Sequence, residues 1–321
     1  MAVYTEVPDD ALAAFVADYD IGAVLSFKGI AEGVENTNYF LHTEAGNFIL
    51  TLYEKRVNEA DLPFFIHLME HLAARGLTCP QPLRNRAGES LGRLAGRPAA
   101  LVTFLEGLSI RRPGPRHCGA LGEALARLHE AGRDFGMRRE NALSLRGWPP
   151  LFEAAKAQAD GVAPGLAERI RSELAYLQDH WPRELPTGVI HADLFTDNVF
   201  FIGENVSGII DFYFACTDFL AYDLAICLNA WCFENDGSFN ITKARALLAG
   251  YERVRRLEDA EVASLPVLCR GSALRFMLTR LVDWLNVPPG ALVKPKDPLE
   301  YDRKLAFHRR AETAAAYGLD R

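Results

Sequence analysis

Hydrophobic and polar residues in the first hundred positions follow the two periods of strands and helices. Alternation with a period of two predicts a hairpin at residues 38–43 and 47–53, with Glu44-Ala45-Gly46 as its turn. The same reasoning predicts strands at 24–28, 91–94 and 99–105, and helices at 8–20 and 58–75. This part of the chain should therefore form a small antiparallel sheet with few helices.

Beyond Gly107 the apolar positions recur mostly at helical spacing. Helices are predicted at 116–131, 164–181, 219–233, 241–254, 260–285 and 299–317. The exception is a strand at 187–190 followed by a hairpin of 198–202 and 206–210. The pattern predicts an α+β protein with a β-rich lobe at 1–105 and a helical lobe at 106–321, with the active site in the cleft between them.

Composition excludes several classes of function. The chain of 321 residues has a net charge of −7, whereas a nucleic-acid surface is expected to be basic. The N-terminus lacks the basic start and apolar core of a signal peptide. The most apolar long window, residues 212–233, is interrupted by Asp218 and Asp223, which favours a buried helix over a membrane span. We predict a protein that contacts neither membrane nor nucleic acid.

The six cysteines are scattered and include no C-x-x-C pair. Several lie among Leu, Ile and Trp, where cysteine behaves as a small hydrophobic residue. A zinc site or a disulfide framework is not expected from this pattern. It indicates a reduced, cytoplasmic protein.

Candidate chemistry is concentrated in residues 189–212, which read VIHADLFTDNVFFIGENVSGIIDF. His191, Asp193 and Asn198 stand in the order His-x-Asp-(four residues)-Asn, and Asp211 follows an apolar strand. Protein kinases use this layout, in which a carboxylate orients the attacking hydroxyl and an Asn and a second Asp supply oxygen ligands to Mg²⁺. A buried Asp between large apolar residues is also costly without a cation or donors around it. The segment predicts a phosphate and metal site.

Further segments extend this pattern over nearly the whole chain. They are EGVENTNYFL (32–41), FILTLYEKR (48–56), LPFFIHLMEHLAARGLTCPQP (62–82), LVTFLEG (101–107), LGEALARLH (121–129), HADLFTDN (191–198), IIDFYFACTDFLAYDLAICLNAWCFE (209–234) and LRFMLTRLVDW (274–284). With them the chain resembles the aminoglycoside phosphotransferase/choline kinase superfamily, which has a protein-kinase-like two-lobe fold. Within it the chain looks most like the homoserine kinases of this fold, the ThrB type.

The resemblance implies roles for the residues of the loop. Asp193 matches the catalytic carboxylate, and Asn198 and Asp211 match the Mg²⁺ ligands. His191 would brace the catalytic loop rather than react, and Asp223 matches a helix residue that supports the loop. The implied cofactors are ATP and Mg²⁺.

The resemblance also implies a nucleotide site in the first lobe. Gly33 and Asn36 fall in the turn that would cover the phosphates. Thr103 and Leu105 fall where the hinge between the lobes would offer backbone groups to adenine. Both assignments rest on position, because a turn of this composition and a strand end are common in any fold.

One departure concerns the ion pair that holds the nucleotide phosphates in this superfamily. The basic residue expected on the third strand falls on Thr51, and its helix Glu partner falls near Phe65. The joint loss is physically coherent, because either charge alone would be unpaired. Lys55 lies on the same strand face as Thr51 and could substitute for the basic residue, with Glu59 within reach.

The acceptor implied by the resemblance is the side-chain hydroxyl of L-homoserine, which would give O-phospho-L-homoserine for threonine biosynthesis. Asp193 would contact that hydroxyl, and Arg275 and Arg280 are candidates to bind the substrate carboxylate. Trp231 is a candidate contact in the helical lobe, where aromatic residues leave open a kinase for choline, an aminoglycoside or another small alcohol. A catalytically silent nucleotide-binding module is the alternative from another class.

Overall fold

The computed structural model describes residues 5–30, 36–54, 57–287 and 295–319. Two compact units make up the chain: unit 1 comprises Met1–Gly107 and Ser207–Tyr213, and unit 2 comprises Leu108–Val206 and Phe214–Arg321. The sequence predicts one division between residues 105 and 106, whereas in the structure residues 207–213 group with unit 1. This return of the chain places Asp211 in the unit of the large sheet.

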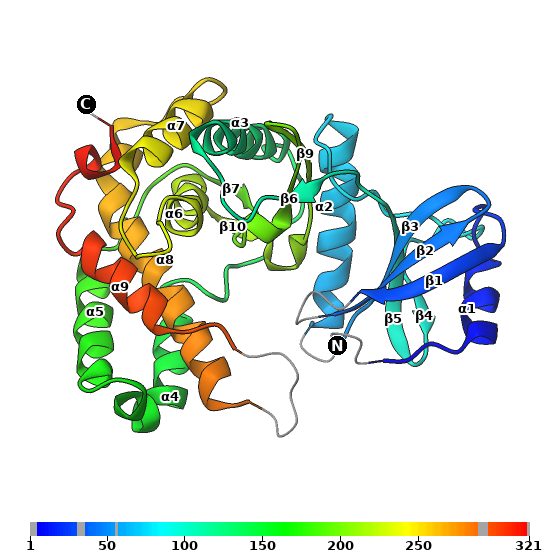
Figure 1. Cartoon of the computed structure of the whole chain (residues 1–321), viewed down its shortest axis with the longest axis horizontal. Coiled ribbons are helices and arrows are strands. Elements are labelled where there is room, and N and C mark those ends of the chain that lie inside the picture. Colours follow the sequence, from blue (N-terminus) through cyan, green and yellow to red (C-terminus); the bar gives the residue numbers. More distant parts are fainter. Residues whose placement is uncertain (1–4, 31–35, 55–56, 288–294, 320–321) are drawn as a thin grey trace. The chain divides into compact units, whose positions relative to one another are not determined.

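Unit 1 is built on a five-stranded antiparallel sheet in the order β1-β2-β3-β5-β4 (Figure 1). Its strands are β1 (Val24–Ile30), β2 (Thr37–Thr43), β3 (Gly46–Leu52), β4 (Gly92–Leu94) and β5 (Arg97–Thr103). The β2–β3 hairpin pairs Thr43 with Gly46, as the alternating pattern predicts. The remaining strands also form where the sequence predicts them, within two residues at either end.

Two helices complete unit 1. Helix α1 (Asp9–Val16) packs its apolar residues on the sheet, where Leu12 and Val16 join Leu41 and Leu50 in one buried cluster. Helix α2 (Leu62–Ala74) follows a short 3₁₀ turn, η1 (Glu59–Asp61), and buries seven side chains. Gly76 follows the end of the helix, and its φ of +84° is the left-handed conformation that a glycine after a helix supplies.

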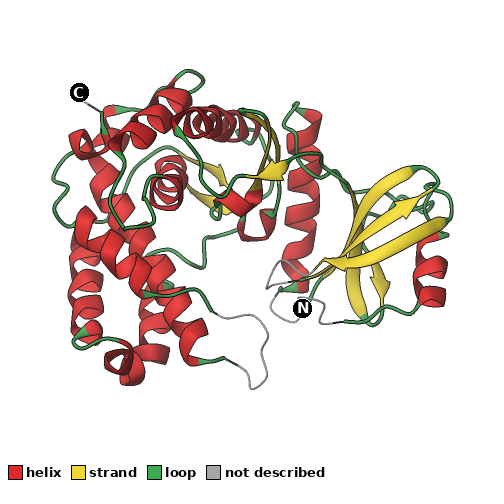
Figure 2. Ribbon diagram, viewed as in Figure 1, coloured by secondary structure: helices red, strands yellow, loops and turns green. Residues whose placement is uncertain are grey.

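Unit 2 is mainly helical (Figure 2). Its helices are α3 (Pro115–Ala131), α4 (Trp148–Val162), α5 (Leu166–His180), α6 (Leu220–Trp231), α7 (Ile241–Glu252), α8 (Asp259–Leu285) and α9 (Leu299–His308), with the 3₁₀ turn η4 (Ala314–Tyr317) at the end. Helix α6 buries all but one of its twelve residues, Ala230. It packs on α8 and is the buried helix that the interrupted apolar window predicts.

Short strands carry the catalytic segment. Strand β7 (Thr187–Ile190) pairs with β10 (Cys216–Phe219), and β6 (Leu108–Ser109) pairs with β8 (Val199–Ile202). Strand β9 (Asn205–Ile209) follows β8 after a turn at Gly203, and the 3₁₀ turns η2 (Thr196–Asn198) and η3 (Phe212–Phe214) flank the hairpin. Strand β10 lies in the stretch between η3 and α6, a part of the chain that the sequence pattern leaves without a predicted strand.

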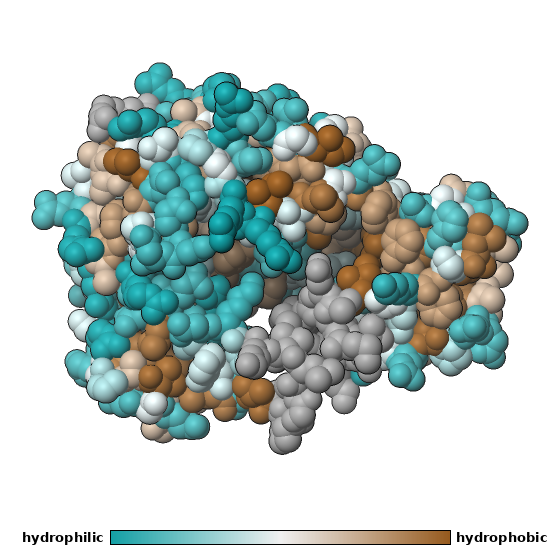
Figure 3. Space-filling view, viewed as in Figure 1, coloured by the Kyte–Doolittle hydropathy of each residue, from teal (hydrophilic) through white to brown (hydrophobic). Residues whose placement is uncertain are grey.

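Hydrophilic residues spread over most of the visible face of unit 2, with small apolar areas between them (Figure 3). Among the described residues, no helix is long and apolar enough to cross a membrane. All six cysteines are buried free thiols.

A buried histidine makes the stability of unit 2 depend on pH. His308 is fully buried, where Nδ1 contacts the Tyr317 hydroxyl at 2.9 Å and Nε2 contacts Asn229 Oδ1 at 3.0 Å. Burial, together with the positive charges of Lys304 and Arg270, lowers the pKa of His308 from 6.5 to about 3. Because the unfolded chain binds the proton first, stability is lost as pH falls from 6.5 toward 3, by about 2 kcal/mol at pH 5.

We therefore expect His308→Gln, which retains hydrogen-bonding groups, to lose less stability between pH 7 and pH 5 than the wild type. Urea unfolding at both pH values measures the difference. His42→Gln changes an exposed histidine of unit 1 and is the control. An equal loss of stability in wild type and His308→Gln would contradict the assignment.

Candidate active site

The catalytic loop begins where β7 ends, and its first residues are hydrogen-bonded to helix α6. The backbone N–H groups of His191 and Ala192 both donate to the carboxylate of Asp223, at 2.7 and 2.9 Å. His129 Nε2 contacts the same carboxylate at 3.1 Å. Asp223 is fully buried, so these hydrogen bonds supply what water would otherwise give a carboxylate. It supports the loop, as the resemblance predicts.

Asp223 is a carboxylate at neutral pH. Burial alone would raise its pKa, but its hydrogen bond with His129, its electrostatic interactions with His129 and His191 and the backbone N–H of His191 outweigh burial and lower the pKa. A negative charge at this point binds two successive backbone N–H groups. The start of the loop is thereby fixed to α6.

Ala192 adopts a backbone conformation that the neighbouring groups stabilise. Its φ is +64°, in the left-handed region that alanine seldom occupies. Asp223 holds its N–H, and Arg275 Nη1 donates to its carbonyl oxygen. Such strain costs on the order of 1–3 kcal/mol and persists where surrounding groups over-determine it. The strained residue immediately precedes Asp193.

Asp193 and Asn198 lie against one another in the loop. Asn198 Nδ2 donates to the backbone oxygen of Asp193 at 2.8 Å and to its Oδ2 at 3.3 Å. With its amide nitrogen used in this way, the oxygen Oδ1 is on the other side of the carboxamide, and no donor to it is found among the described residues. Asp193 is half-buried, and Asn198 is buried. The structure therefore brings together two of the residues that the motif predicts.

His191 is buried and stabilises the conformation of the loop. The backbone N–H of Asp193 donates to its Nδ1 at 3.3 Å, so the imidazole is a local acceptor for the residue that it precedes. The ring is fully buried. This placement agrees with the bracing role that the resemblance implies.

Asp211 belongs to unit 1, at the end of the segment that returns there. Its φ is +63°, and Asp is one of the few non-glycine residues that tolerate this region. The side chain is half-buried. A second strained backbone position thus coincides with a residue that the motif predicts to bind a metal.

The oxygen atoms of Asn198 and Asp211 suit Mg²⁺, which prefers hard oxygen ligands and is often bound by one or two carboxylates plus substrate phosphates. Asn198 fits because its donor side is already used by Asp193 while Oδ1 is left as an acceptor. Among the described residues, no group of three or more His, Cys, Asp or Glu side chains forms a closed metal cage. The chain therefore suits a metal that completes its coordination with phosphate oxygens.

Two of the four residues predicted to contact the substrate support the loop instead. Arg275 is 1% exposed, donates to the backbone oxygen of Ala192 and lies over the ring of Phe276 at 4.5 Å. Trp231 is also 1% exposed, and its indole N–H donates to the backbone oxygen of Leu194 at 2.8 Å. The prediction that Arg275 meets a substrate carboxylate is corrected here, because its guanidinium is buried under the loop.

Arg280 is nearly buried and belongs to a charged cluster between α8 and α9. Its Nη1 donates to Glu300 at 2.6 Å and to the backbone oxygen of Asp297 at 3.2 Å, and its guanidinium lies 4.5 Å from the ring centre of Tyr301. Burial would raise the pKa of Glu300, but the charges of Lys304 and Arg280 outweigh it and hold that pKa at about 2. Two cations thus share one carboxylate.

The predicted nucleotide residues of unit 1 have separate surroundings. Thr103 uses its backbone N–H to bond the Gln81 oxygen at 3.0 Å, so that N–H is not free for adenine. Asn36 Oδ1 accepts from the Glu54 N–H at 3.3 Å. Leu105 follows β5, and no backbone acceptor for its N–H is found among the described residues. Gly33 and Lys55 lie outside the described residues.

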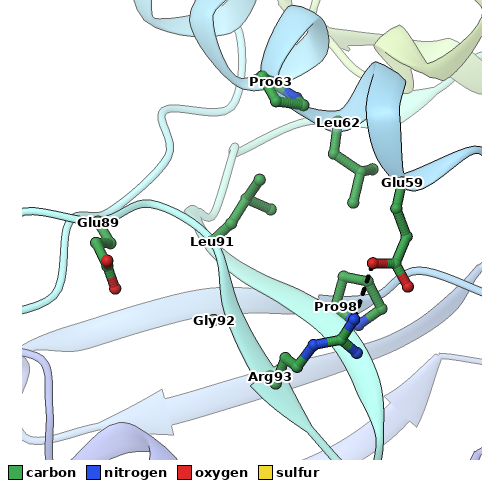
Figure 4. Close-up of a pocket in the computed structure, with 8 residues that line it drawn as sticks. All are labelled: Glu59, Leu62, Pro63, Glu89, Leu91, Gly92, Arg93 and Pro98. Atoms are coloured by element: carbon green, nitrogen blue, oxygen red, sulfur yellow. Dashed lines mark hydrogen bonds and ion pairs between the residues drawn. The ribbon is translucent and has the colours of Figure 1, made fainter.

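Glu59, the predicted partner of Lys55, pairs with Arg93 at 2.8 Å. Both residues line a pocket of unit 1 with Leu62, Pro63, Glu89, Leu91, Gly92 and Pro98 (Figure 4). The pocket contains none of the residues that the sequence predicts to bind nucleotide, metal or substrate. We therefore assign no part of the phosphotransfer chemistry to it.

Sequence reasoning missed two residues that lie next to the predicted site. His129 ends the run LGEALARLH, which was recognised as a whole, but only the fold shows its bond to Asp223. Tyr213 comes two residues after Asp211, in the run IIDFYF. Its hydroxyl lies 3.2 Å from that of Tyr53, a partner 160 positions away that no local pattern could indicate.

Comparison with known proteins shows the family of this chain. The model of the phosphotransferase enzyme family matches residues 26–257, and the chain belongs to this family. A homoserine kinase of Methylobacterium nodulans is 75% identical over 99% of both chains, and one of another Methylobacterium species is 74% identical over the same shares. The solved amicoumacin kinase in complex with AMP-PNP and Ca²⁺ has a TM-score of 0.69 at 16% identity, covering 95% of this chain and 92% of its own. That likeness shows the protein-kinase-like fold.

Proposed function

We propose that this protein is a homoserine kinase that transfers the γ-phosphoryl group of ATP to the side-chain hydroxyl of L-homoserine. The observation that carries the proposal is the loop in which Asp193 and Asn198 are held together on the buried Asp223, in a chain 75% identical to a homoserine kinase over 99% of its length. The products are O-phospho-L-homoserine and ADP, on the route to threonine. The biosynthetic role and the six buried free thiols agree with a cytoplasmic location.

Asp193 is the proposed catalytic carboxylate. It accepts a hydrogen bond from the acceptor hydroxyl, orients its oxygen toward the γ-phosphorus and takes its proton as the new O–P bond forms and ADP leaves. The hydrogen bond from Asn198 Nδ2 to Asp193 keeps the carboxylate in place. Asp223 and Arg275 act through the backbone of Ala192, so they position Asp193 without touching the substrate.

Asn198 and Asp211 are the proposed Mg²⁺ ligands. When bound, the metal neutralises the charge on the phosphate oxygens. Asn198 offers a carboxamide oxygen, and Asp211 offers a carboxylate. They belong to different units, and the proposal that they serve one ion rests on the motif His-x-Asp-(four residues)-Asn with its following Asp.

The substrate carboxylate is assigned to Arg280 in this proposal. Arg275 is excluded because its guanidinium is buried and bonded to Ala192. Arg280 retains guanidinium N–H groups beyond the Nη1 that bonds Glu300 and Asp297, and it is one of the two cations that share the Glu300 carboxylate. A second anion would therefore find excess positive charge there.

Measuring ADP release with a panel of acceptors tests the substrate. We expect L-homoserine to have a kcat/KM about 10- to 200-fold above that of L-serine, which is one methylene shorter. Choline and aminoglycosides, which lack the amino-acid carboxylate, should be poorer still. A higher kcat/KM for choline or an aminoglycoside would overturn the substrate and retain the kinase, whereas no ADP release with any acceptor would favour the silent nucleotide-binding module.

A further inference from the structure

The β3 position that carries a basic residue elsewhere in the superfamily faces a cluster of hydroxyl groups in this protein. Leu50 and Leu52 point to the core shared with α1. Because side chains alternate along a strand, Thr51 and Tyr53 point to the opposite face. Both are buried, with 3% and 2% of their surface exposed. A lysine at position 51 would have to bury its charge here.

Tyr213 meets these two side chains from the segment that returns to unit 1. Its hydroxyl lies 3.2 Å from that of Tyr53, within hydrogen-bond distance, and faces the side chain of Thr51. Thr51 in turn donates to Asn38 Oδ1 at 2.8 Å. Either of the two tyrosine hydroxyls can donate to the other, because each carries one proton and accepts through its oxygen. Asn38, Thr51, Tyr53 and Tyr213 thus form a cluster of neutral polar groups.

The helix partner of the usual ion pair is replaced at the same point. Phe65 of α2, which falls near the expected Glu position, packs edge-to-face on Tyr213 with ring centres 5.7 Å apart and planes at 90°. Tyr53 also packs edge-to-face on Tyr213, with ring centres 5.3 Å apart and planes at 82°. Such pairs contribute about 0.5–1.5 kcal/mol beyond the area that they bury. Strand β3 and helix α2 are thus joined through the ring and hydroxyl of Tyr213.

Tyr213 is close in sequence to the predicted metal ligand Asp211. Asp211 lies two residues earlier and has a φ of +63°, a conformation that requires support from its surroundings. The intervening Phe212 is buried. A side chain anchored at residue 213 by one hydrogen bond and two aromatic contacts limits the rotation of this short segment. The carboxylate of Asp211 is held at its place by the same anchor.

We propose that Tyr213 is a positioning residue for Asp211, anchored by the hydroxyl of Tyr53 at the end of β3 and by the ring of Phe65 on α2, and that these neutral contacts replace the missing ion pair between strand and helix. The inference rests on the proposed metal role of Asp211. It explains why both charged partners are lost together, since Tyr213 and Phe65 fill the space between β3 and α2 without a charge. Tyr213 itself does not touch the substrate.

The test is Tyr213→Phe, which keeps the ring and its packing and removes only the hydroxyl. Mn²⁺ binding in the presence of ADP, followed by electron paramagnetic resonance without turnover, is the direct measurement. We expect the Mn²⁺ dissociation constant to rise about 3- to 10-fold, the usual range for one hydrogen bond. The Mg²⁺ concentration for half-maximal turnover should rise by the same factor, while the KM for L-homoserine stays within twofold.

Tyr39→Phe is the matched control, because it removes a tyrosine hydroxyl from the neighbouring strand β2 that bonds the Thr5 carbonyl oxygen at 2.9 Å. It should leave Mn²⁺ binding unchanged. Equal effects of the two substitutions, or unchanged Mn²⁺ binding in Tyr213→Phe, would overturn the proposal.

A double-mutant cycle separates a network from independent contacts. Tyr53→Phe and Tyr213→Phe each remove one partner of the same hydrogen bond. The Mn²⁺ dissociation constant of the double variant should therefore lie within about twofold of that of the weaker-binding single variant. Additive losses would overturn the network. Asp211→Asn separates the proposed metal site from the proposed anchor. If Asp211→Asn retains Mn²⁺ binding, the metal site itself is refuted. If Asp211→Asn loses Mn²⁺ binding while Tyr213→Phe binds Mn²⁺ normally, only the anchor is refuted.

Discussion

Asp193→Asn is expected to lower kcat with L-homoserine by about 10²- to 10⁴-fold, the range for a group that orients and deprotonates a reacting hydroxyl. Asn has the same shape, and its amide can still lie beside Asn198. It lacks the charge that binds the acceptor proton. The fold should persist, because the loop is held through the backbone of His191 and Ala192 by Asp223. Steady-state kinetics and a thermal unfolding curve measure both effects.

Asp197→Asn is the matched control within the same loop. Its side chain is 63% exposed and lies 3.7 Å from Lys296, so the substitution removes a charge of the same sign only four residues away. We expect turnover within about twofold of the wild type, since surface ion pairs contribute little. Near-normal kcat in a folded Asp193→Asn protein would refute the assignment of the catalytic carboxylate.

Substitution of Asp211 is expected to remove turnover and metal binding together. Asp211→Ala takes away the carboxylate but also places alanine at a φ of +63°, which adds backbone strain. Asp211→Asn is therefore the cleaner variant, because Asn tolerates this conformation. Both should reduce kcat by at least about 10²-fold, on the scale of a lost catalytic group. Asn198→Ala should instead raise the Mg²⁺ concentration required.

Asp20→Asn serves as the control in unit 1, since that carboxylate is 85% exposed and pairs only at the surface with Arg86. It should leave the Mg²⁺ requirement unchanged. Full activity of the wild type in excess chelator would exclude the metal from the mechanism, and full activity of Asp211→Asn would exclude Asp211 as its ligand.

Local sequence patterns predicted an element correctly where the spacing of apolar residues and the residue types of the adjoining turn indicated the same structure. The β2–β3 hairpin has alternating apolar residues and a turn that ends on Gly46, whose φ is +132°. Helix α4 was missed because Pro149 and Pro150 resemble a break, although proline is well tolerated in the first turn of a helix. Strand β10 was missed because its four residues, Cys216–Phe219, show no regular alternation of apolar and polar positions.

The sequence by itself determined the chemistry of the catalytic loop. Asp193 and Asn198 are five positions apart, so a short loop and a single 3₁₀ turn are sufficient to bring Asn198 Nδ2 onto Asp193. The order of residue types also indicated phosphoryl transfer before any contact was known. Both inferences depend only on neighbours along the chain.

Only the tertiary structure decided which residues support that loop. Arg275 reaches the oxygen of Ala192 across 83 positions, and Tyr213 reaches the hydroxyl of Tyr53 across 160. An arginine that binds a substrate and one that holds a backbone oxygen have the same sequence pattern, because burial is set by the packing of distant elements. The neutral replacement for the missing ion pair became visible for the same reason, when the fold placed Thr51, Phe65 and Tyr213 in contact.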